Sequence, residues 1–448
     1  MARLVSVLTC CVGLCATSAC GPVRIAILGE DTAVDTGTPS TDTDTDTDYV
    51  PPDTSPPPVE TADTAPDTDS PPVDTGVTDT IDPIEPVDPT DRLFADDEIL
   101  TYEILLSDES FEALLEDPYT YVEGALLFEG DSYVVGVRTK GQNSWRPINE
   151  KPSLKVKMDW VVKDQEFYEL EELTFNAMND DPTMMHERVA YRMYREADIP
   201  AARATHAWMV VNGIDYGLYT HLETVDKTMM RRWFDNADGI LWEQWDVDFY
   251  DEYIPCPNPG EQACFELEYG TDDRSILQAI ADAFESGSLA DQIEAASQTL
   301  DYAQFIRYWA VGSVTAQTDA YPYSDPGDDC HVYFDVESSR LIYVPHGVDE
   351  TFVDDWSHPG TNADGILSTK CYDDPTCRST WEAEVFEILD IADAIGLFDY
   401  AAEVKQQIEP HVAADNRKHY STSSVYDEQE DMLQFISQRR SKIENWLD

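Results

Sequence analysis

Residues 31–90 contain no lysine or arginine, sixteen acidic side chains, and an unbroken alternation of threonine and aspartate from Thr41 to Asp48. Such a segment has little apolar surface to bury against the entropy cost of ordering, and its like charges and prolines keep it extended. It cannot supply a folded core. We therefore expect residues 21–91 to form a disordered acidic tether and residues 92–448 to form the folded domain.

The first twenty residues have the pattern of an export signal. They carry Arg3, a short apolar run and small residues before Cys20. The run is too short for a convincing membrane span. The ending resembles a bacterial lipoprotein signal, which implies that Cys20 is lipidated and anchors the protein to the membrane of the cell envelope, at the outer membrane or cell surface. An ordinary cleaved secretory signal is the alternative, and both interpretations predict an exported protein.

The chain is strongly anionic, with a net charge of -62 at pH 7. The sixteen acids of residues 31–90 account for a minority of this charge, so the folded part is acidic as well. A surface of this sign repels nucleic acid and anionic lipid head groups, so we expect no nucleic-acid partner. An anionic ligand would need a local basic pocket.

Five cysteines follow the export signal. Cys256 and Cys264 are close in sequence, as are Cys371 and Cys377, and all four lie in loop-like sequence, which favours two local disulfides in an exported protein. Cys330 is then left over, and a distant partner or a different pairing stays open. A structural zinc site is the weaker alternative, because no Cys-x-x-Cys pair is present.

The folded part alternates strand and helix patterns. Residues 153–159 alternate strictly, so their apolar side chains face one way and Lys155 and Lys157 face the other, with an exposed lysine face as the default interpretation. Asn212-Gly213 stands between two apolar runs, 205–211 and 216–222, and predicts a hairpin because both residues tolerate positive φ.

Other elements are predicted from their apolar periodicity. The order of strands and helices predicts an α+β domain. We expect a strand at 132–138, helices at 183–197, 276–286 and 302–315, strands at 331–336 and 341–344, and a mostly helical stretch from 381 to 446.

Several motifs follow one another along this order, and together they resemble the spore-coat protein H-like (CotH) kinase family. The likeness extends over about residues 100–352 and continues more loosely to the C-terminus. The hairpin is the most specific match. The matching segments are Lys140-Gly141-Gln142-Asn143-Ser144, Lys151-Pro152-Ser153-Leu154-Lys155-Val156-Lys157, Leu173 to Asn176, Asp181, Ala197-Asp198-Ile199-Pro200, Asn212-Gly213-Ile214-Asp215-Tyr216-Gly217-Leu218-Tyr219 and Glu223-Thr224-Val225-Asp226-Lys227.

The resemblance implies an atypical protein kinase-like fold, with an N-terminal mixed or antiparallel sheet and a helix-rich C-terminal part. It also implies a secreted or coat-associated enzyme that phosphorylates other proteins from ATP. Phosphoryl transfer needs positive charge on the phosphates, divalent metal held by carboxylates, and a carboxylate near the attacking hydroxyl. We therefore expect ATP with magnesium or manganese as cofactors.

The nucleotide-facing candidates are basic. Lys155 is our first choice for phosphate contact, with Lys140 and Lys157 as weaker choices, because all three lie on adjacent strand-like segments. Such a lysine needs a buried carboxylate to orient it, and Glu223 at the end of the hairpin is the candidate.

The acidic candidates lie downstream. Asp319 stands where the family has an Asp after a helix, which implies the catalytic carboxylate, and Asp349 matches the second Asp of the family's Trp-Asp-x-Asp motif, which implies a metal ligand. The first Asp of that motif is replaced by Gly347. Asp329, near the place of the family's metal-binding Asn, can coordinate magnesium instead, while His331 or His346 would suit a softer metal.

Two hypotheses follow. The first is an exported kinase-like phosphotransferase acting on serine or threonine of envelope or surface proteins. The second, motivated by Gly347 and the acidic exterior, is a catalytically inactive module for surface binding or assembly. A calcium-dependent adhesin is a distant third, suggested by the Thr-Asp repeat of the tether.

Overall fold

The structure is a computed structural model, and it describes residues 88–260, 263–323, 327–353 and 358–447. The chain divides into two units, Met1–Ile81 and Asp82–Asp448. The predicted export signal, Cys20 and the tether up to residue 87 lie outside the described residues. Residues 89–91, assigned above to the tether, instead belong to the short helix η1(Pro89–Arg92), in which Thr90 is buried. Among the described helices, none is both long and apolar enough to cross a membrane.

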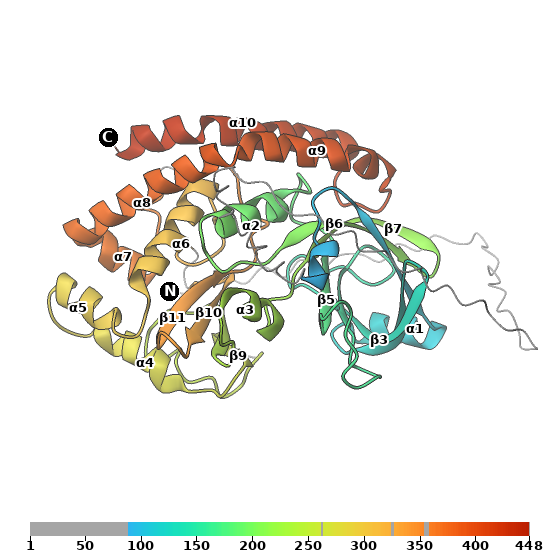
Figure 1. Ribbon diagram of the computed structural model, residues 1–448, viewed down its shortest axis with the longest axis horizontal. Coiled ribbons are helices and arrows are strands. Elements are labelled where there is room, and N and C mark those ends of the chain that lie inside the picture. The colour runs from blue at the N-terminus through green and yellow to red at the C-terminus, as the bar shows by residue number, and fades with distance from the viewer. Residues whose placement is uncertain (1–87, 261–262, 324–326, 354–357, 448) are drawn as a thin grey trace, which may run out of the picture. The chain divides into compact units, whose positions relative to one another are not determined.

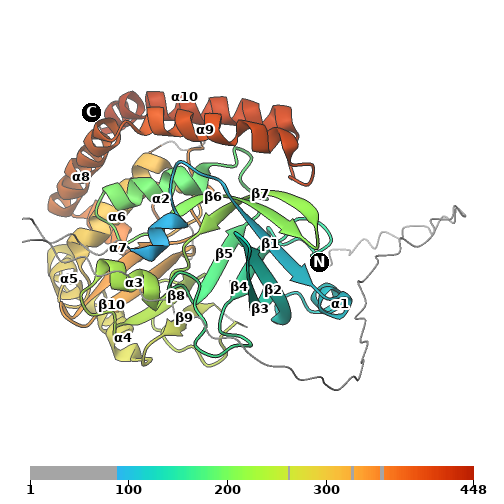
Figure 2. The same cartoon turned by 45° about the vertical axis from the view of Figure 1, so that its right-hand side comes forward.

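Seven strands close into a barrel in the order β1-β2-β3-β4-β5-β7-β6 (Figure 2). Neighbours run antiparallel except β1 and β6, which pair in parallel with Leu100 opposite Ala207. The sheet is mixed, which is one of the two alternatives predicted, but its closure into a barrel was not predicted: the parallel pairing gives both edge strands a partner. The strands are β1(Leu100–Leu106), β2(Val122–Phe128), β3(Asp131–Lys140), β4(Ser153–Lys157), β5(Glu172–Asn176), β6(Ala204–Val211) and β7(Ile214–Leu222).

Aromatic side chains fill the barrel. The ring of Tyr102 lies 4.9 Å from the rings of both Phe128 and Phe175. The predicted alternation of β4 is confirmed, because the apolar side chains of this strand are fully buried in the barrel core while Lys155 and Lys157 point outward.

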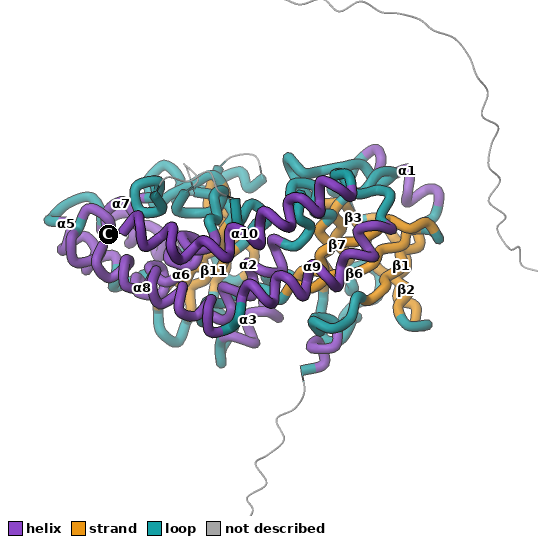
Figure 3. Tube along the Cα trace, turned by 90° about the horizontal axis from the view of Figure 1, so that it is seen from above, coloured by secondary structure: helices purple, strands orange, loops and turns teal. Residues whose placement is uncertain are grey.

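A second, antiparallel sheet has the order β11-β10-β8-β9, and helices pack around it (Figure 1). Helices α9 and α10 lie side by side, and α9 also packs against the hairpin strand β7 (Figure 3). The helix-rich C-terminal part is thus confirmed. The remaining elements are α1(Asp108–Glu116), α2(His186–Glu196), α3(Lys227–Trp233), β8(Ile240–Trp245), β9(Cys264–Tyr269), α4(Arg274–Ala283), α5(Leu289–Ala296), α6(Tyr302–Thr315), β10(Cys330–Asp335), β11(Arg340–Pro345), α7(Ile366–Asp373), α8(Pro375–Ala394), α9(Leu397–Ala414) and α10(Thr422–Leu447).

The strongest local predictions are confirmed. The hairpin turns at Asn212-Gly213, where both residues have positive φ, and α6 begins and ends at the predicted residues. The other predicted elements are present with ends shifted by a few residues. Local turn chemistry and long apolar periodicity are therefore sufficient to predict these elements.

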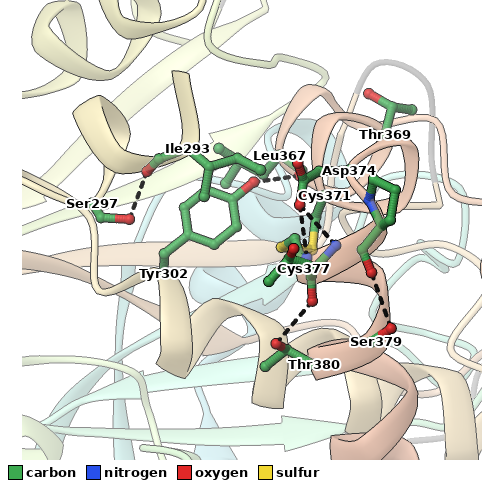
Figure 4. The surroundings of a disulfide bond; sticks show 12 residues. Ile293, Ser297, Tyr302, Leu367, Thr369, Cys371, Asp374, Cys377, Ser379 and Thr380 are labelled. Carbon is green, nitrogen blue, oxygen red and sulfur yellow. Dashed lines mark hydrogen bonds between the residues drawn. A yellow bond between two sulfur atoms is a disulfide. The ribbon is translucent and has the colours of Figure 1, made fainter. Parts of the chain in front are cut away.

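Both predicted disulfides are present, Cys256–Cys264 and Cys371–Cys377. The second closes the turn between α7 and α8, where Asp374 accepts hydrogen bonds from the first backbone N–H groups of α8 (Figure 4). Cys330 is buried and free, with its Sγ 3.3 Å from Oε1 of Gln244.

A buried ion pair ties the C-terminal helices to the hairpin. Nζ of Lys151 lies 2.7 Å from Oδ2 of Asp415, with 2% and 0% of the two side chains exposed. Asp415, in the turn after α9, also accepts the backbone N–H of Leu218 on β7 at 3.0 Å. A Cβ at Gly217 would lie 2.2 Å from the carboxyl carbon of Asp415, so only glycine allows this approach.

We expect Asp415→Ala to lower the free energy of unfolding by about 3–5 kcal/mol, because it leaves the Lys151 ammonium buried without a partner. Urea denaturation of the full chain measures this. Asp427→Ala, an exposed aspartate on the neighbouring helix α10, serves as the control and should change stability by about 0.5 kcal/mol or less. Equal effects of the two substitutions would contradict the role of the pair.

His206 is buried and neutral. Its Nε2 donates to the carbonyl oxygen of Met184 at 2.7 Å, and its Nδ1 accepts from Arg188 at 3.1 Å. Burial, followed by the nearby Arg188 charge, lowers the pKa of His206 to about 3. Since an unfolded histidine takes up a proton near pH 6.5, the unfolded state binds more protons than the native state between these values.

The stability that His206 contributes is therefore fully present above about pH 6.5 and declines as the pH falls, by about 2 kcal/mol at pH 5. His206→Gln should flatten the decline of the urea midpoint between pH 7 and pH 5. His419→Gln, at an exposed histidine, should leave it unchanged. An unaltered slope in the His206 variant would refute this assignment.

Candidate functional site

A cleft of about 920 Å³ lies between barrel strands β3, β4 and β5 on one side and β8, β9 and the loops beside β10 and β11 on the other. Segments far apart in the sequence line it together. The residues to which the sequence assigned a nucleotide, metal or catalytic role all line this cleft, and their roles stay predictions. They are Lys140, Lys155, Lys157, Glu223, Asp319, Asp329 and Asp349.

The barrel wall of the cleft carries a lysine that is oriented through an amide. Lys140, the last residue of β3, donates from Nζ to Oδ1 of Asn176 on β5 at 2.8 Å. Asn176 in turn donates from Nδ2 to Oε1 of Glu187 on α2. Burial, followed by the Asp349 charge, raises the pKa of Glu187 to about 8, and burial lowers the pKa of Lys140. An amide therefore bridges a half-buried lysine and a buried carboxyl group.

The first residues of α2 connect the two walls. The buried Asp181 accepts hydrogen bonds from the backbone N–H groups of Thr183, Met184 and His186 and so fixes where the helix begins. His186 then donates from Nδ1 to the carbonyl oxygen of Asp349 at 2.7 Å. The next residue, Glu187, reaches the opposite wall through Asn176. Adjacent residues of one helix thus hold both sides of the cleft.

The acidic wall is made by two loops that are fastened to each other. Gln317 donates from Nε2 to the carbonyl oxygen of Gly347 at 2.8 Å, which ties the loop after α6 to the loop after β11. Asp319 lies close enough to Asp329 for its carboxyl group to help raise the pKa of Asp329. Burial, followed by the Asp349 charge, holds the pKa of Asp329 well above its usual range, and burial is also the main cause that raises the pKa of Asp349.

Gly347 faces the carboxyl group of Asp329. A Cβ built on Gly347 would lie 2.2 Å from Cγ of Asp329 and 2.3 Å from its Oδ2. The aspartate side chain therefore occupies the space into which a side chain at position 347 would project. The carboxylate missing from position 347 is supplied to the same place from the start of β10.

The acidic wall suits a hard divalent cation in its chemistry. Asp319, Asp329 and Asp349 offer oxygen ligands, and their mutual repulsion is the kind that a cation relieves. Among the described residues, the carboxylates that lie close enough together to hold a metal ion by themselves are Asp251, Asp282 and Glu285, on the exposed surface. The three aspartates of the cleft are not that close to one another. A cation in the cleft would therefore need further oxygen ligands besides these carboxylates.

One predicted partner is wrong. Glu223 does not orient a cleft lysine: its Oε1 accepts from Arg203 and from Arg232, each at 2.8 Å, and its Oε2 accepts from the backbone of Arg203. Two guanidinium groups reach this buried carboxylate, that of Arg203 just before β6 and that of Arg232 on α3, and the sequence predicted neither partner. Glu223 therefore stabilises the end of the hairpin.

The predicted lysines of β4 have partners of their own. Nζ of Lys155 lies 2.7 Å from Glu172 on the neighbouring strand. Burial alone would raise the pKa of Glu172, but Lys155 and hydrogen bonds outweigh burial and lower it. Lys157 is more exposed and lies 3.9 Å from Asp159. Of the three cleft lysines, Lys140 is thus the one that a buried acid orients. The sequence had instead favoured Lys155 for phosphate contact.

The cleft is not a predominantly basic pocket. Acidic side chains outnumber basic ones in its lining. The rings of its two histidines, His331 and His346, meet edge to face at 4.8 Å. Burial lowers the pKa of His331 to about 4, so this imidazole is neutral. A highly charged anion can enter only together with cations.

Sequence analysis gave no role to Asn176 or Glu187. Asn176 was part of a quoted motif, but its partners lie on other elements. Glu187 carried a usable signal: Tyr191 and Tyr194 follow it at the i+4 and i+7 positions, which places a carboxylate on the apolar stripe of α2. A buried acid inside such a stripe points to a specific partner.

A comparison with protein families decides the relationship. The profile described as "CotH kinase protein" matches residues 137–443. The chain belongs to the CotH kinase family. The residues described above for both walls lie within the matched region. Lys140, Asn176 and Glu187 and the acidic loops are therefore parts of the family domain.

Two known proteins show more distant likeness to this CotH member. Invasin CotH7 of Rhizopus delemar is 23% identical over 242 residues, which cover 46% of this chain and 37% of the invasin. The chain thus spans well under half the length of that relative. The HipA–HipB–operator DNA complex of Shewanella oneidensis MR-1 contains a chain that aligns with a TM-score of 0.35 and 12% identity, covering 77% of this chain and 73% of that one.

Gly347→Asp, which introduces the side chain typical of the family at this position, should lower the free energy of unfolding by about 2–3 kcal/mol, because the new side chain overlaps Asp329. Removing that side chain in Gly347→Asp/Asp329→Gly should recover at least half of the loss. Urea denaturation measures both.

The matched control is Gly213→Asp, at a glycine that also has positive φ but no atom within 4 Å of the added Cβ. It should cost about 1 kcal/mol from backbone strain alone. If Gly347→Asp costs no more than this control, the crowding by Asp329 is not real.

Proposed function

We propose that this protein is an exported, atypical protein kinase-like phosphotransferase that uses ATP and magnesium or manganese. The carrying observation is that one cleft gathers an oriented lysine on its barrel wall and three aspartates on the facing loops. Phosphoryl transfer depends on positioning and on charge stabilisation, and these two walls can supply both. Membership of the CotH kinase family supports the same chemistry.

In this proposal, Lys140 contacts the phosphates of ATP, and the Asn176 to Glu187 connection keeps its ammonium group directed into the cleft. Lys155 adds a second positive charge from β4. The loop Gly141 to Ser144 lines the cleft beside Lys140, so its backbone N–H groups are near the phosphates. A positive φ of 105° at Gly141 lets the loop turn there.

Asp349 and Asp329 would hold the divalent cation, whose chemistry when bound would be to neutralise the charge of the phosphate oxygens. Asp319 accepts the proton of the attacking hydroxyl group. The hydroxyl oxygen of a serine or threonine then forms a bond to the γ-phosphorus while the bond between that phosphorus and the β-γ bridging oxygen breaks, and ADP leaves. The influence of Asp319 on the pKa of Asp329 supports this division of roles, because it requires the two carboxyl groups to be near each other.

The substrate and location belong to the proposal as well. The export signal pattern and Cys20 favour lipid attachment to the bacterial cell envelope. Residues 31–90 are long enough to separate a membrane anchor from the kinase domain. Serine or threonine side chains of neighbouring envelope or surface proteins are then within reach as acceptors.

A second candidate function is a catalytically inactive surface-binding module. Gly347 in place of an acidic residue favours it, and so does the description of the Rhizopus relative as an invasin. Calorimetry separates the two candidates. The inactive module predicts no nucleotide binding, whereas metal-dependent ATP binding that is lost on Lys155→Ala or Lys140→Met would count against it.

The phosphotransferase proposal predicts that the full-length protein transfers the labelled γ-phosphate of ATP to envelope proteins in the presence of magnesium or manganese. Lys140→Met and Asp319→Ala should each reduce this transfer by about 100-fold or more, since they remove phosphate contact and the proton acceptor. Lys163→Met removes a lysine that is 90% exposed and should leave the rate unchanged.

Absence of transfer to every envelope protein, together with no ATP binding, would overturn the proposal. Transfer that persists undiminished in Asp319→Ala would overturn the role of that residue. Circular dichroism of each variant excludes unfolding as the cause of a lost activity.

A further inference from the structure

The connection between the neighbouring strands β3 and β4, residues 141–152, is held mainly through its backbone carbonyl groups (Figure 2). The donors that hold its later part lie on the hairpin and just after α9. Tyr216 donates to the carbonyl oxygen of Ile148 at 2.7 Å, Arg417 to those of Asn149 and Glu150 at 3.0 and 2.6 Å, and Tyr219 to that of Pro152 at 3.0 Å. These contacts fasten the later part of the connection to the hairpin and to the C-terminal helices.

The earlier part of the connection, from Gly141 to Ser144, lines the cleft and is held at both of its ends. The hydroxyl group of Tyr119, before β2, donates to the carbonyl oxygen of Gly141 at 2.9 Å. Nδ2 of Asn179 donates to the carbonyl oxygen of Ser144 at 3.0 Å and to that of Lys151 at 3.2 Å. Asn179 thereby joins the cleft-lining part of the connection to the start of β4.

Asn179 is itself fixed in place, because it is buried between β5 and α2 with 4% of its surface exposed. Both of its partners are carbonyl oxygens, which can only accept, so the amide nitrogen must face them. Asn179 follows Asn176, which binds Lys140, and precedes Asp181, which fixes the start of α2. The same short segment therefore positions the cleft lysine and the loop beside it.

A loop whose carbonyl oxygens face protein donors keeps its N–H groups available for an anion. Among the described residues, the backbone N–H groups of Gln142, Asn143 and Ser144 have no partner. A Cβ at Gly141 would lie 2.9 Å from Oγ of Ser144, and the φ of Gly141 is positive, so the turn into this loop requires glycine. Because the loop is held before a ligand arrives, less ordering is needed when phosphate oxygens bind to it.

We propose that Asn179 and Tyr119 are positioning residues, which set the affinity of the cleft for the phosphates of a nucleotide by holding the loop from Gly141 to Ser144. This inference rests on the proposed function, because it names the residues that prepare the loop for ATP. Both side chains act through carbonyl groups of the loop. Their removal should therefore weaken the binding of a nucleotide that carries phosphates and spare a nucleoside that carries none.

Calorimetry of the full-length protein with ATP and magnesium tests the proposal, with adenosine measured by competition against ATP. Asn179→Leu removes both hydrogen bonds at similar volume and should weaken ATP binding by about tenfold. Adenosine binding should weaken by less than about twofold, whereas a general disturbance of the cleft would weaken both ligands alike. Equal weakening of the two ligands, or an unchanged affinity for ATP, would overturn the role of Asn179.

Tyr216→Phe is the matched control. It removes a buried hydrogen bond from the same connection, but at Ile148, which does not line the cleft. It should lower the urea midpoint about as much as Asn179→Leu does and change the ATP affinity by less than about twofold. A loss of ATP affinity as large as that of Asn179→Leu would overturn the proposal, because any weakening of the connection would then have the same effect.

Tyr119→Phe tests the same loop even if Asn179→Leu fails to fold, because Tyr119 is 52% exposed and keeps its ring in this variant. It should weaken ATP binding by about twofold to threefold and leave adenosine binding unchanged. No ATP binding by the unaltered protein would overturn the proposed function and this inference with it. ATP binding that is the same in the unaltered protein and in both variants would overturn the positioning roles alone.

Discussion

The beginning of α2 is the constraint on which the candidate site depends. Asp181 fixes the start of the helix through three backbone N–H groups, and this sets the direction of the next two side chains. His186 holds the backbone of Asp349 on the acidic wall, while Glu187 reaches Lys140 through the amide of Asn176. Because these residues are adjacent on one rigid element, the two walls of the cleft cannot move independently at this point.

Glycine at position 347 does not leave this part of the cleft without a carboxyl group, because Asp329 provides one. Its missing side chain leaves room for Asp329, which points into the same space from the start of β10. The carboxyl group of Asp329 therefore occupies the space that a side chain at position 347 would fill. The raised pKa of the Asp329 carboxyl group, caused by burial and by Asp349, is a property that functional sites often share.

Local patterns predicted much of the fold. The hairpin at Asn212-Gly213, helix α6 and both disulfides follow from turn chemistry, apolar periodicity and short cysteine spacing, which act within a few residues. Closure of the barrel did not follow, because it depends on the parallel pairing of β1 with β6, two strands about a hundred residues apart. The residues that the motif order singled out do line one cleft. Their hydrogen-bond partners were not predicted: Glu223, for example, is bound by two arginines.

The sequence by itself determined the family, the mixed sheet, the helix-rich C-terminal part and the residues that carry charge into the cleft. These properties depend on residue type and order, which the chain states directly. Only the tertiary structure decided that Lys140 has the orienting acid, that the cleft is more acidic than basic, and that Asp329 fills the space beside Gly347. Each of these depends on distances between side chains from different elements, and the electrostatic effects that follow fall steeply with distance and rise with burial.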